Sequence, residues 1–130
     1  MQTPAIWSEI QVQYREPGHD IAQRLLRLSI AAEEISRHLP SGANGRHVST
    51  QLVRSATAAG ANYDEARSPE SRADFIHKLG IALKELREAR YWLSFVAGSK
   101  MAAVDPVLLD EARQLIAILM ASRRTAASKE

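Results

Sequence analysis

Apolar residues along this chain recur at alternating intervals of four and three, the spacing of one face of an α-helix. The first run covers about residues 20–39 and ends in the turn-forming sequence LPSGANG. Its apolar positions are Ile21, Leu25, Leu28, Ala32, Ile35 and Leu39. The pattern predicts an amphipathic helix with Asp20 as its N-cap.

A second run, over about residues 46–67, keeps this spacing but has small residues at its centre. Its inward positions are Val48, Leu52, Ser55, Ala56, Ala59, Asn62, Tyr63 and Ala66. The distance between packed helices depends on the side chains at the contact. We therefore expect this helix to lie unusually close to its neighbour.

The third run, over about residues 69–97, predicts the longest helix, with Ser68 as N-cap, Pro69 as first residue and Gly98 at its end. Its core side carries Phe75, Leu79, Ala82, Leu83, Leu86, Ala89 and Leu93. The opposite side carries Ile81, Trp92 and Phe95, which an isolated subunit would leave in water. This apolar group is a candidate oligomer interface. The alternative is that an N-terminal arm, residues 1–18, covers it with Ile6, Trp7 and Ile10.

The fourth run, over about residues 106–123, begins at Asp105-Pro106, again a cap followed by a helix-starting proline. Residues 125–130 have no apolar rhythm, and we expect a frayed tail. Four amphipathic segments with short connections predict an all-α, up-down-up-down antiparallel four-helix bundle over residues 19–124.

Composition is that of one globular domain: 130 residues, of which 45% are hydrophobic and 25% charged. The absence of cysteine excludes disulfides, thiolate nucleophiles and cysteine-ligated metals. With neither a membrane-length apolar run nor a leader-like N-terminus, we expect a cytoplasmic protein. The net charge of +2 permits nucleic-acid binding without arguing for it.

Asn62 falls on the core side of the second helix, where a buried amide requires partners. Glu85 and Glu88 of the third helix are candidates, and Arg54 and Arg90 could supply the countercharges. One interpretation is a buried polar network that sets the register of the two central helices. The alternative is a small-ligand pocket around Asn62, Glu85 and Glu88.

Catalytic patterns are weak. The sequence has no Glu-x-x-His of the di-iron type, so we expect no metal and no cofactor. Ser55 and Thr57 are expected to bond backbone carbonyls, as such residues commonly do in helices, and no nucleophile elbow or phosphate-binding loop is present. An enzyme is not expected.

Basic residues gather on the third helix, with Tyr91 and Trp92 interleaved. The candidate nucleic-acid contacts are Arg72, Lys78, Lys84 and Arg87. The alternative is that these side chains serve solubility. A symmetric assembly would repeat the patch in every subunit and strengthen its field.

Residues 52–93, LVRSATAAGANYDEARSPESRADFIHKLGIALKELREARYWL, closely resemble the bacterial four-helix bundle family named after the protein encoded in 23S rRNA intervening sequences. The matching motifs are Gly-Ala-Asn-Tyr-x-Glu-Ala, Ser-x-x-Asp-Phe-x-x-Lys-Leu and Ala-Leu-Lys-Glu-x-x-Glu-x-x-Tyr-Trp-Leu. The resemblance implies a bundle that assembles into a ring, a homopentamer, of unknown function and without established enzymatic activity.

A relative of that family is the accessory variability determinant of diversity-generating retroelements, a basic barrel that binds a reverse transcriptase and nucleic acid. We therefore expect a non-catalytic homo-oligomeric scaffold whose partners are RNA, DNA or a protein that processes them, with no membrane involvement.

Overall fold

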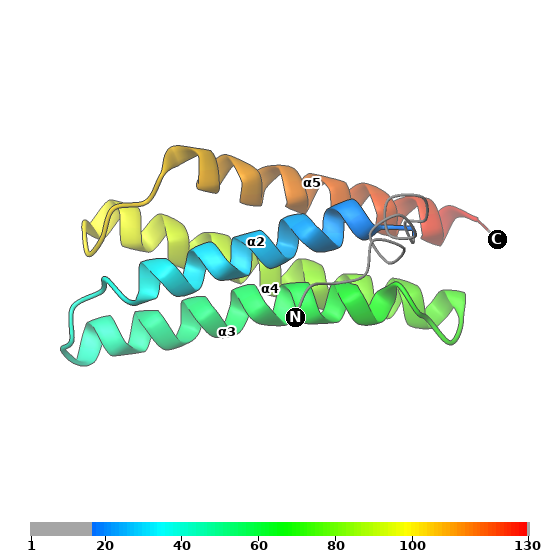
Figure 1. Ribbon diagram of the computed structural model, residues 1–130. Helices are drawn as coiled ribbons and strands as arrows, with labels where there is room; N and C mark the ends of the chain where they lie inside the picture. The colour runs from blue at the N-terminus through cyan, green and yellow to red at the C-terminus, as the bar shows by residue number, and fades with distance from the viewer. Residues whose placement is uncertain (1–16, 130) are drawn as a thin grey trace, which may run out of the picture.

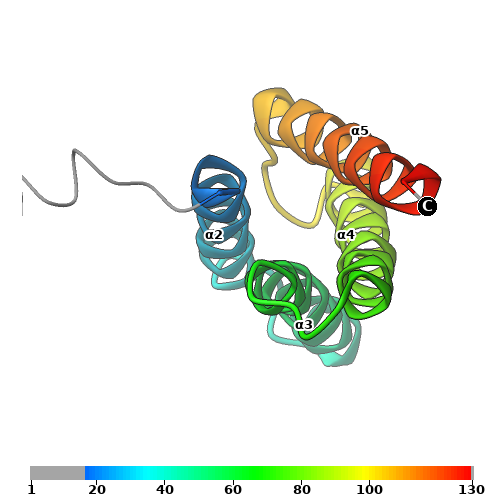
Figure 2. The same ribbon diagram turned by 90° about the vertical axis from the view of Figure 1, so that its right-hand side faces the viewer.

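The computed structural model describes residues 17–129, which form an all-α four-helix bundle (Figure 1). The helices are α2 (His19–Ser36), α3 (Ala43–Ala66), α4 (Arg72–Ser99) and α5 (Pro106–Ser128). They alternate in direction along the bundle (Figure 1) and follow chain order around its axis (Figure 2). Apart from Pro17 and Gly18, the predicted N-terminal arm lies outside the described residues. No helix in the described range is long and apolar enough to cross a membrane.

The core consists mainly of leucines from all four helices. Those almost completely buried are Leu25, Leu28, Leu52, Leu79, Leu86, Leu93, Leu115 and Leu119. Burying each such side chain contributes about 1.5–3 kcal/mol relative to its exposure. All eight are positions that the alternating four and three spacing assigns to the inside. Among helices that neighbour each other around the bundle, contact is most extensive between α3 and α4 and least extensive between α2 and α5.

Small residues bring α3 close to α2, as the sequence predicts. Ser29 of α2 lies with its Oγ 3.0 Å from the carbonyl oxygen of Ala56 and 3.1 Å from that of Leu25. A methyl group at Gly60 would lie 3.6 Å from the same hydroxyl. Ser29 can therefore be buried without losing its hydrogen bond, because α3 offers a backbone acceptor at close range.

The start of α5 is as predicted, whereas the ends of α4 differ from the prediction. Asp105 accepts a hydrogen bond from the Val107 N–H, and Pro106 opens α5. The N-cap of α4 is Ser71 instead of Ser68, because its Oγ accepts a bond from the Asp74 N–H at 3.0 Å. Gly98 lies inside the helix, and Lys100 is the C-cap in a left-handed conformation, with φ 62°.

The N-terminus of α2 also differs from the prediction. Its N-cap is Gly18, with φ 80°, and Asp20 lies in the first turn. A side chain at Gly18 would meet the Tyr63 hydroxyl at 2.6 Å. Both the left-handed backbone and the neighbouring ring therefore require glycine here. Burial of Tyr63 raises its pKa above the ordinary value.

The prediction of a frayed tail is wrong for most of its range, since α5 continues to Ser128. The segment Thr125–Ser128 contains two alanines and no helix breaker, so nothing in it stops the helix. Thr125 and Ala126 also line a shallow cavity with Phe75 of α4. Packing against α4 thus accompanies helix formation where apolar periodicity is absent.

Candidate functional site

The predicted site residues fall mainly along one surface, here called the α3/α4 seam, where α3 lies beside the edge of α4. Its members are His47, Arg54 and Asn62 from α3 and Ile81, Glu85, Glu88, Trp92 and Phe95 from α4. The α4 members are spaced three or four residues apart, which places them along one side of the helix. The seam therefore combines the residues predicted for the polar network with those predicted for the oligomer interface.

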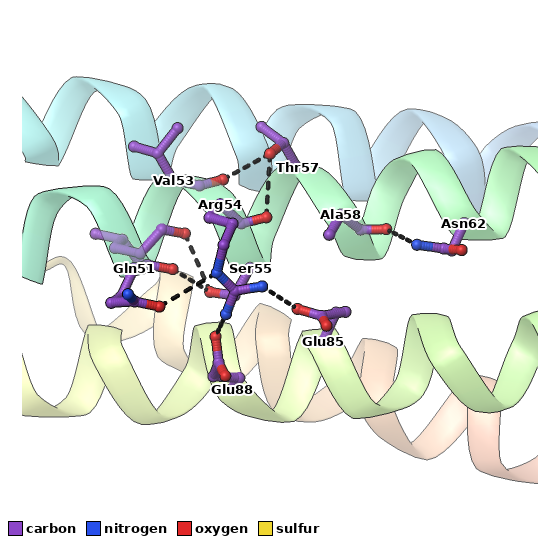
Figure 3. Close-up of polar contacts among 10 residues, drawn as sticks. Gln51, Val53, Arg54, Ser55, Thr57, Ala58, Asn62, Glu85 and Glu88 are labelled. Atoms are coloured by element: carbon purple, nitrogen blue, oxygen red, sulfur yellow. Dashed lines mark hydrogen bonds and ion pairs between the residues drawn. The ribbon is translucent and has the colours of Figure 1, made fainter.

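Arg54 joins the two helices of the seam by pairing with both carboxylates of α4 (Figure 3). Its Nη1 lies 3.0 Å from Glu85 Oε2, and its Nη2 contacts Glu88 Oε2. The Oε2 atom of Glu88 is buried and has no hydrogen bond of good geometry, so the ion pair with Arg54 is its interaction. The side chains of Arg54 and Glu88 are 44% and 40% exposed, and that of Glu85 is 16% exposed. Because the network is half-open to water, its electrostatic contribution is modest.

The structure does not bring Asn62 and Arg90 into this network. The Asn62 amide donates to the Ala58 carbonyl of its own helix at 2.8 Å (Figure 3). Asn62 is half-buried, so one turn of its own helix supplies an acceptor before α4 is needed. Arg90 is exposed on α4. The inter-helix link consequently consists of Arg54, Glu85 and Glu88.

The helical hydroxyls of α3 bond backbone carbonyls, as expected. Ser55 Oγ donates to the Gln51 carbonyl at 2.8 Å, and Thr57 Oγ1 donates to the Val53 carbonyl at 2.7 Å (Figure 3). Neither hydroxyl faces a histidine or carboxylate that would activate it. Across the described part of the chain, no three histidine or acidic side chains gather as metal ligands would.

The apolar group of the seam is less exposed than predicted. Trp92 packs against the core, and its ring meets those of His47 and Phe95 edge-on, with centroids 5.7 and 5.9 Å apart. Ile81 is also half-buried, whereas Phe95 is 39% exposed. The prediction that all three would face water in one subunit is therefore wrong for Ile81 and Trp92, because neighbouring side chains of the bundle shelter them.

The exposed charge of α4 is mostly positive, although the side chain of Glu88 is 40% exposed. Its exposed charged residues are Arg72, Lys84, Arg87 and Arg90. All three acids of the helix are half-buried: Asp74 accepts a bond from the Glu70 N–H, and Glu85 and Glu88 pair with Arg54. Lys78, the fourth predicted nucleic-acid contact, is half-buried and lies 3.9 Å from Glu65.

Arg87 of α4 and Arg123 of α5 are each held in place by a group other than a carboxylate. Arg87 Nη2 lies 3.2 Å from the Met120 sulfur of α5. Arg123 of α5 donates from Nε to the Ile76 carbonyl at 3.3 Å and lies over Gly80, where a Cβ would be 3.2 Å from Nε. Neither guanidinium is in an ion pair with a described carboxylate. We call Lys84, Arg87, Tyr91 and Arg123 the basic face.

On the other side of the bundle, Arg24 links α2 to α5. Its Nε and Nη2 donate to the two carboxylate oxygens of Glu111 at 2.9 and 2.6 Å, and Nη2 also reaches Gln114 Oε1 at 3.2 Å. The hydrogen bond from Arg24 lowers the pKa of Glu111. The same pair raises the pKa of Arg24. This bidentate bridge therefore stays charged at neutral pH.

Comparison with known proteins decides the family. The sequence profile described as 23S rRNA-intervening sequence protein matches residues 18–121. The chain belongs to this family. The family match thus covers α2, α3, α4 and most of α5, in agreement with the resemblance seen in residues 52–93.

A solved structure supports the same assignment of fold. A protein of unknown function from the S23 ribosomal protein family of Bacteroides thetaiotaomicron VPI-5482 is 29% identical, with a TM-score of 0.69. The similarity covers 79% of this chain and 97% of that one. Among curated proteins, none matches the chain.

Within this 23S rRNA-intervening sequence family member, the basic face extends beyond the matched range at Arg123. Reasoning from the sequence missed this residue, because the apolar rhythm of α5 fades before it. The spacing of Met120, Arg123 and Arg124 continues the helical period, which indicates that α5 extends as far as Arg123. Gly80 was also missed, since its role depends on a side chain from another helix.

Proposed function

We propose that this protein is a non-catalytic, homo-oligomeric scaffold of the cytoplasm that binds nucleic acid through the basic face. The carrying observation is that the most exposed charged residues of α4 are basic, while its three acids are engaged in bonds or ion pairs with other groups. A surface of this kind attracts phosphates.

The geometry of the basic face favours backbone recognition over base reading. Lys84 and Arg87 lie about one turn apart, and Arg123 adds a charge from α5 beside them. Arg87 and Arg123 are already oriented by Met120 and the Ile76 carbonyl, so ordering them on a phosphate costs less entropy. Tyr91 is 59% exposed and offers a ring on which an unpaired base can stack.

The names of the family and of its structural relative favour RNA as the first probe. The family is named for 23S rRNA intervening sequences, and the Bacteroides protein is placed in a ribosomal protein family. Assembly strengthens the proposal, because each added subunit repeats the same basic face and raises the effective concentration of binding sites.

Salt-titrated binding of a labelled single-stranded RNA tests the proposal. Replacing Lys84 and Arg87 together with glutamine should weaken binding about tenfold or more at low salt. The slope of log Kd against log salt should fall by about 1 for each cation removed. Tyr91→Ala should weaken single-stranded binding and leave duplex binding nearly unchanged, since stacked pairs offer no free base face.

The matched control replaces Arg27 and Arg46 with glutamine, which removes two exposed cations from α2 and α3. If this control weakens binding as much as the Lys84 and Arg87 pair, net charge explains the affinity and the basic face does not. RNA binding that is insensitive to salt would also contradict the proposal.

A further inference from the structure

A groove lies between α2 and α5, on the side of the bundle where helix contact is least extensive. Its volume is about 920 Å³. Ile35 of α2 and Leu108 of α5 are half-buried and form its apolar floor, and Val107 stands at its mouth with 73% of its surface exposed. The Arg24 bridge to Glu111 and Gln114 bounds one end.

The rim of this groove is acidic although the chain as a whole is basic. Among the described residues, the lining includes four carboxylates and a histidine but no lysine or arginine: Glu34, His38, Asp105, Asp110 and Glu111. Arg24 and Arg113 neutralise Glu111 and Asp110 by direct ion pairs. Glu34 of α2 supplies a further negative charge, and Asp105, the N-cap of α5, supplies another while its Oδ1 accepts a bond from the Val107 N–H.

The length of the groove suits a short helix. The lining extends from the N-cap Asp105 to Gln114, and its helical part along α5, from Pro106 to Gln114, covers eight steps or about 12 Å. An occupying helix of that length presents apolar anchors at positions i, i+4 and i+7, the usual mode by which an amphipathic helix fills an apolar groove. Basic residues beside those anchors would meet Glu34 and Asp105.

We propose that the α2/α5 groove is a docking site for a basic amphipathic helix of a partner protein. Charge complementarity selects this occupant, since an acidic or neutral helix gains nothing from the carboxylates of the rim. The groove is lined by α2 and the first turns of α5, whereas the basic face lies on α4 and at Arg123 near the end of α5, so the groove can be occupied while nucleic acid is bound. It is thereby independent of the proposed nucleic-acid function.

A labelled helical peptide with leucines at i, i+4 and i+7 and lysines elsewhere tests the site by fluorescence anisotropy. It should bind, and a peptide with glutamate in place of every lysine should not. Replacing Glu34 by Gln and Asp105 by Asn should weaken the lysine peptide about tenfold. Asparagine still caps α5, so the fold is retained. Val107→Ser should weaken binding through lost apolar contact alone.

The control replaces Glu65 and Glu70 by glutamine, two exposed acids outside the groove, and should leave affinity unchanged. Equal binding of the lysine and glutamate peptides, or loss of affinity in the control, would overturn the proposal. So would failure of the lysine peptide to bind.

Because the chain lacks cysteine, Val107→Cys carries a single photo-crosslinker at the mouth of the groove. Mass spectrometry then identifies what occupies it. Crosslinking to the added lysine peptide supports the proposal. Crosslinking to a second copy of the chain or to its own residues 1–16, with the peptide unable to compete, overturns it and assigns the groove to that occupant instead.

Discussion

At the scale of single residues, two glycines in this bundle differ sharply in what surrounds them. A methyl group at Gly45 in the first turns of α3 would lie 1.8 Å from the Pro40 carbonyl oxygen, a backbone atom that cannot rotate away. At Gly98, inside α4, an added methyl meets no atom within 4 Å. The α2–α3 connection therefore requires glycine at position 45, whereas position 98 near the end of α4 has room for a side chain.

Gly45→Ala should lower the free energy of unfolding by about 2 kcal/mol or more, because the loop must move to remove the overlap. Gly98→Ala should raise it by about 0.5–1 kcal/mol, since alanine restricts the unfolded chain and favours helix. Urea unfolding followed by circular dichroism measures both. Equal effects of the two substitutions would contradict the close contact at Pro40.

At the scale of helices, α2 and α5 are joined by the bridge from Arg24 to Glu111, whereas α3 and α4 are joined by extensive packing. The bridge lowers the pKa of Glu111 in the folded state. A carboxylate with a depressed folded pKa stabilises the fold above its unfolded pKa of 4.5, and this stabilisation is lost as the pH falls through the folded pKa.

Thermal unfolding should show this dependence. The native chain should lose stability as the pH falls from about 5 to 3, and Glu111→Gln should lose less over the same range, because its side chain cannot be protonated. Glu70→Gln, an exposed acid outside the bridge, is the control and should follow the native profile. Identical profiles for the native chain and Glu111→Gln would show that the bridge contributes nothing.

At the scale of the whole molecule, two of the surfaces with exposed apolar side chains are compared as subunit contacts. Phe95 extends the α3/α4 seam, while Leu26 and Ile30 lie half-exposed and four residues apart on α2. We propose that the subunit contact lies at the seam, where the aromatic group of His47, Trp92 and Phe95 continues to the surface. The ring of subunits is the assembly that the family resemblance implies.

Phe95→Glu should therefore reduce the mass measured by light scattering, because it places a charge in an apolar contact. Helix content should be retained, since Phe95 is already part-exposed in one subunit. Leu26→Glu should leave the mass unchanged. The reverse result would move the subunit contact to α2, and no change in either variant would remove the seam from consideration.

Much of this fold follows from local pattern. The alternating spacing places the leucines of the core, and Asp105 with Pro106 marks the start of α5, because both signals depend on neighbours within one or two turns. The small residues of α3 likewise indicate close packing, which Ser29 and Ala56 confirm. The sequence favours Ser68 as the N-cap of α4, whereas the cap is Ser71, because both precede plausible first turns and only the bond to Asp74 distinguishes them.

The candidate site was only partly predictable. Arg54, Glu85 and Glu88 were expected together and do meet, but Asn62 finds its acceptor within α3. The sequence places Trp92 on the outer side of α4, yet its large ring reaches back to pack against the core. Sequence position sets the direction of a Cα–Cβ bond, whereas the reach of a long side chain depends on the space beside it.

By itself, the sequence determined the helical class, the order of the elements, the buried stripes and the family to which the chain belongs, because each is written in periodicity or motif. Tertiary structure decided which charges lack an ion-pair partner among the described residues. On the basic face, Arg87 and Arg123 are oriented by contacts between helices far apart in the chain. At the groove, Glu34 and Asp105 come together from α2 and the start of α5. Electrostatic character at a surface depends on pairing in space, which no count of residues along the chain contains.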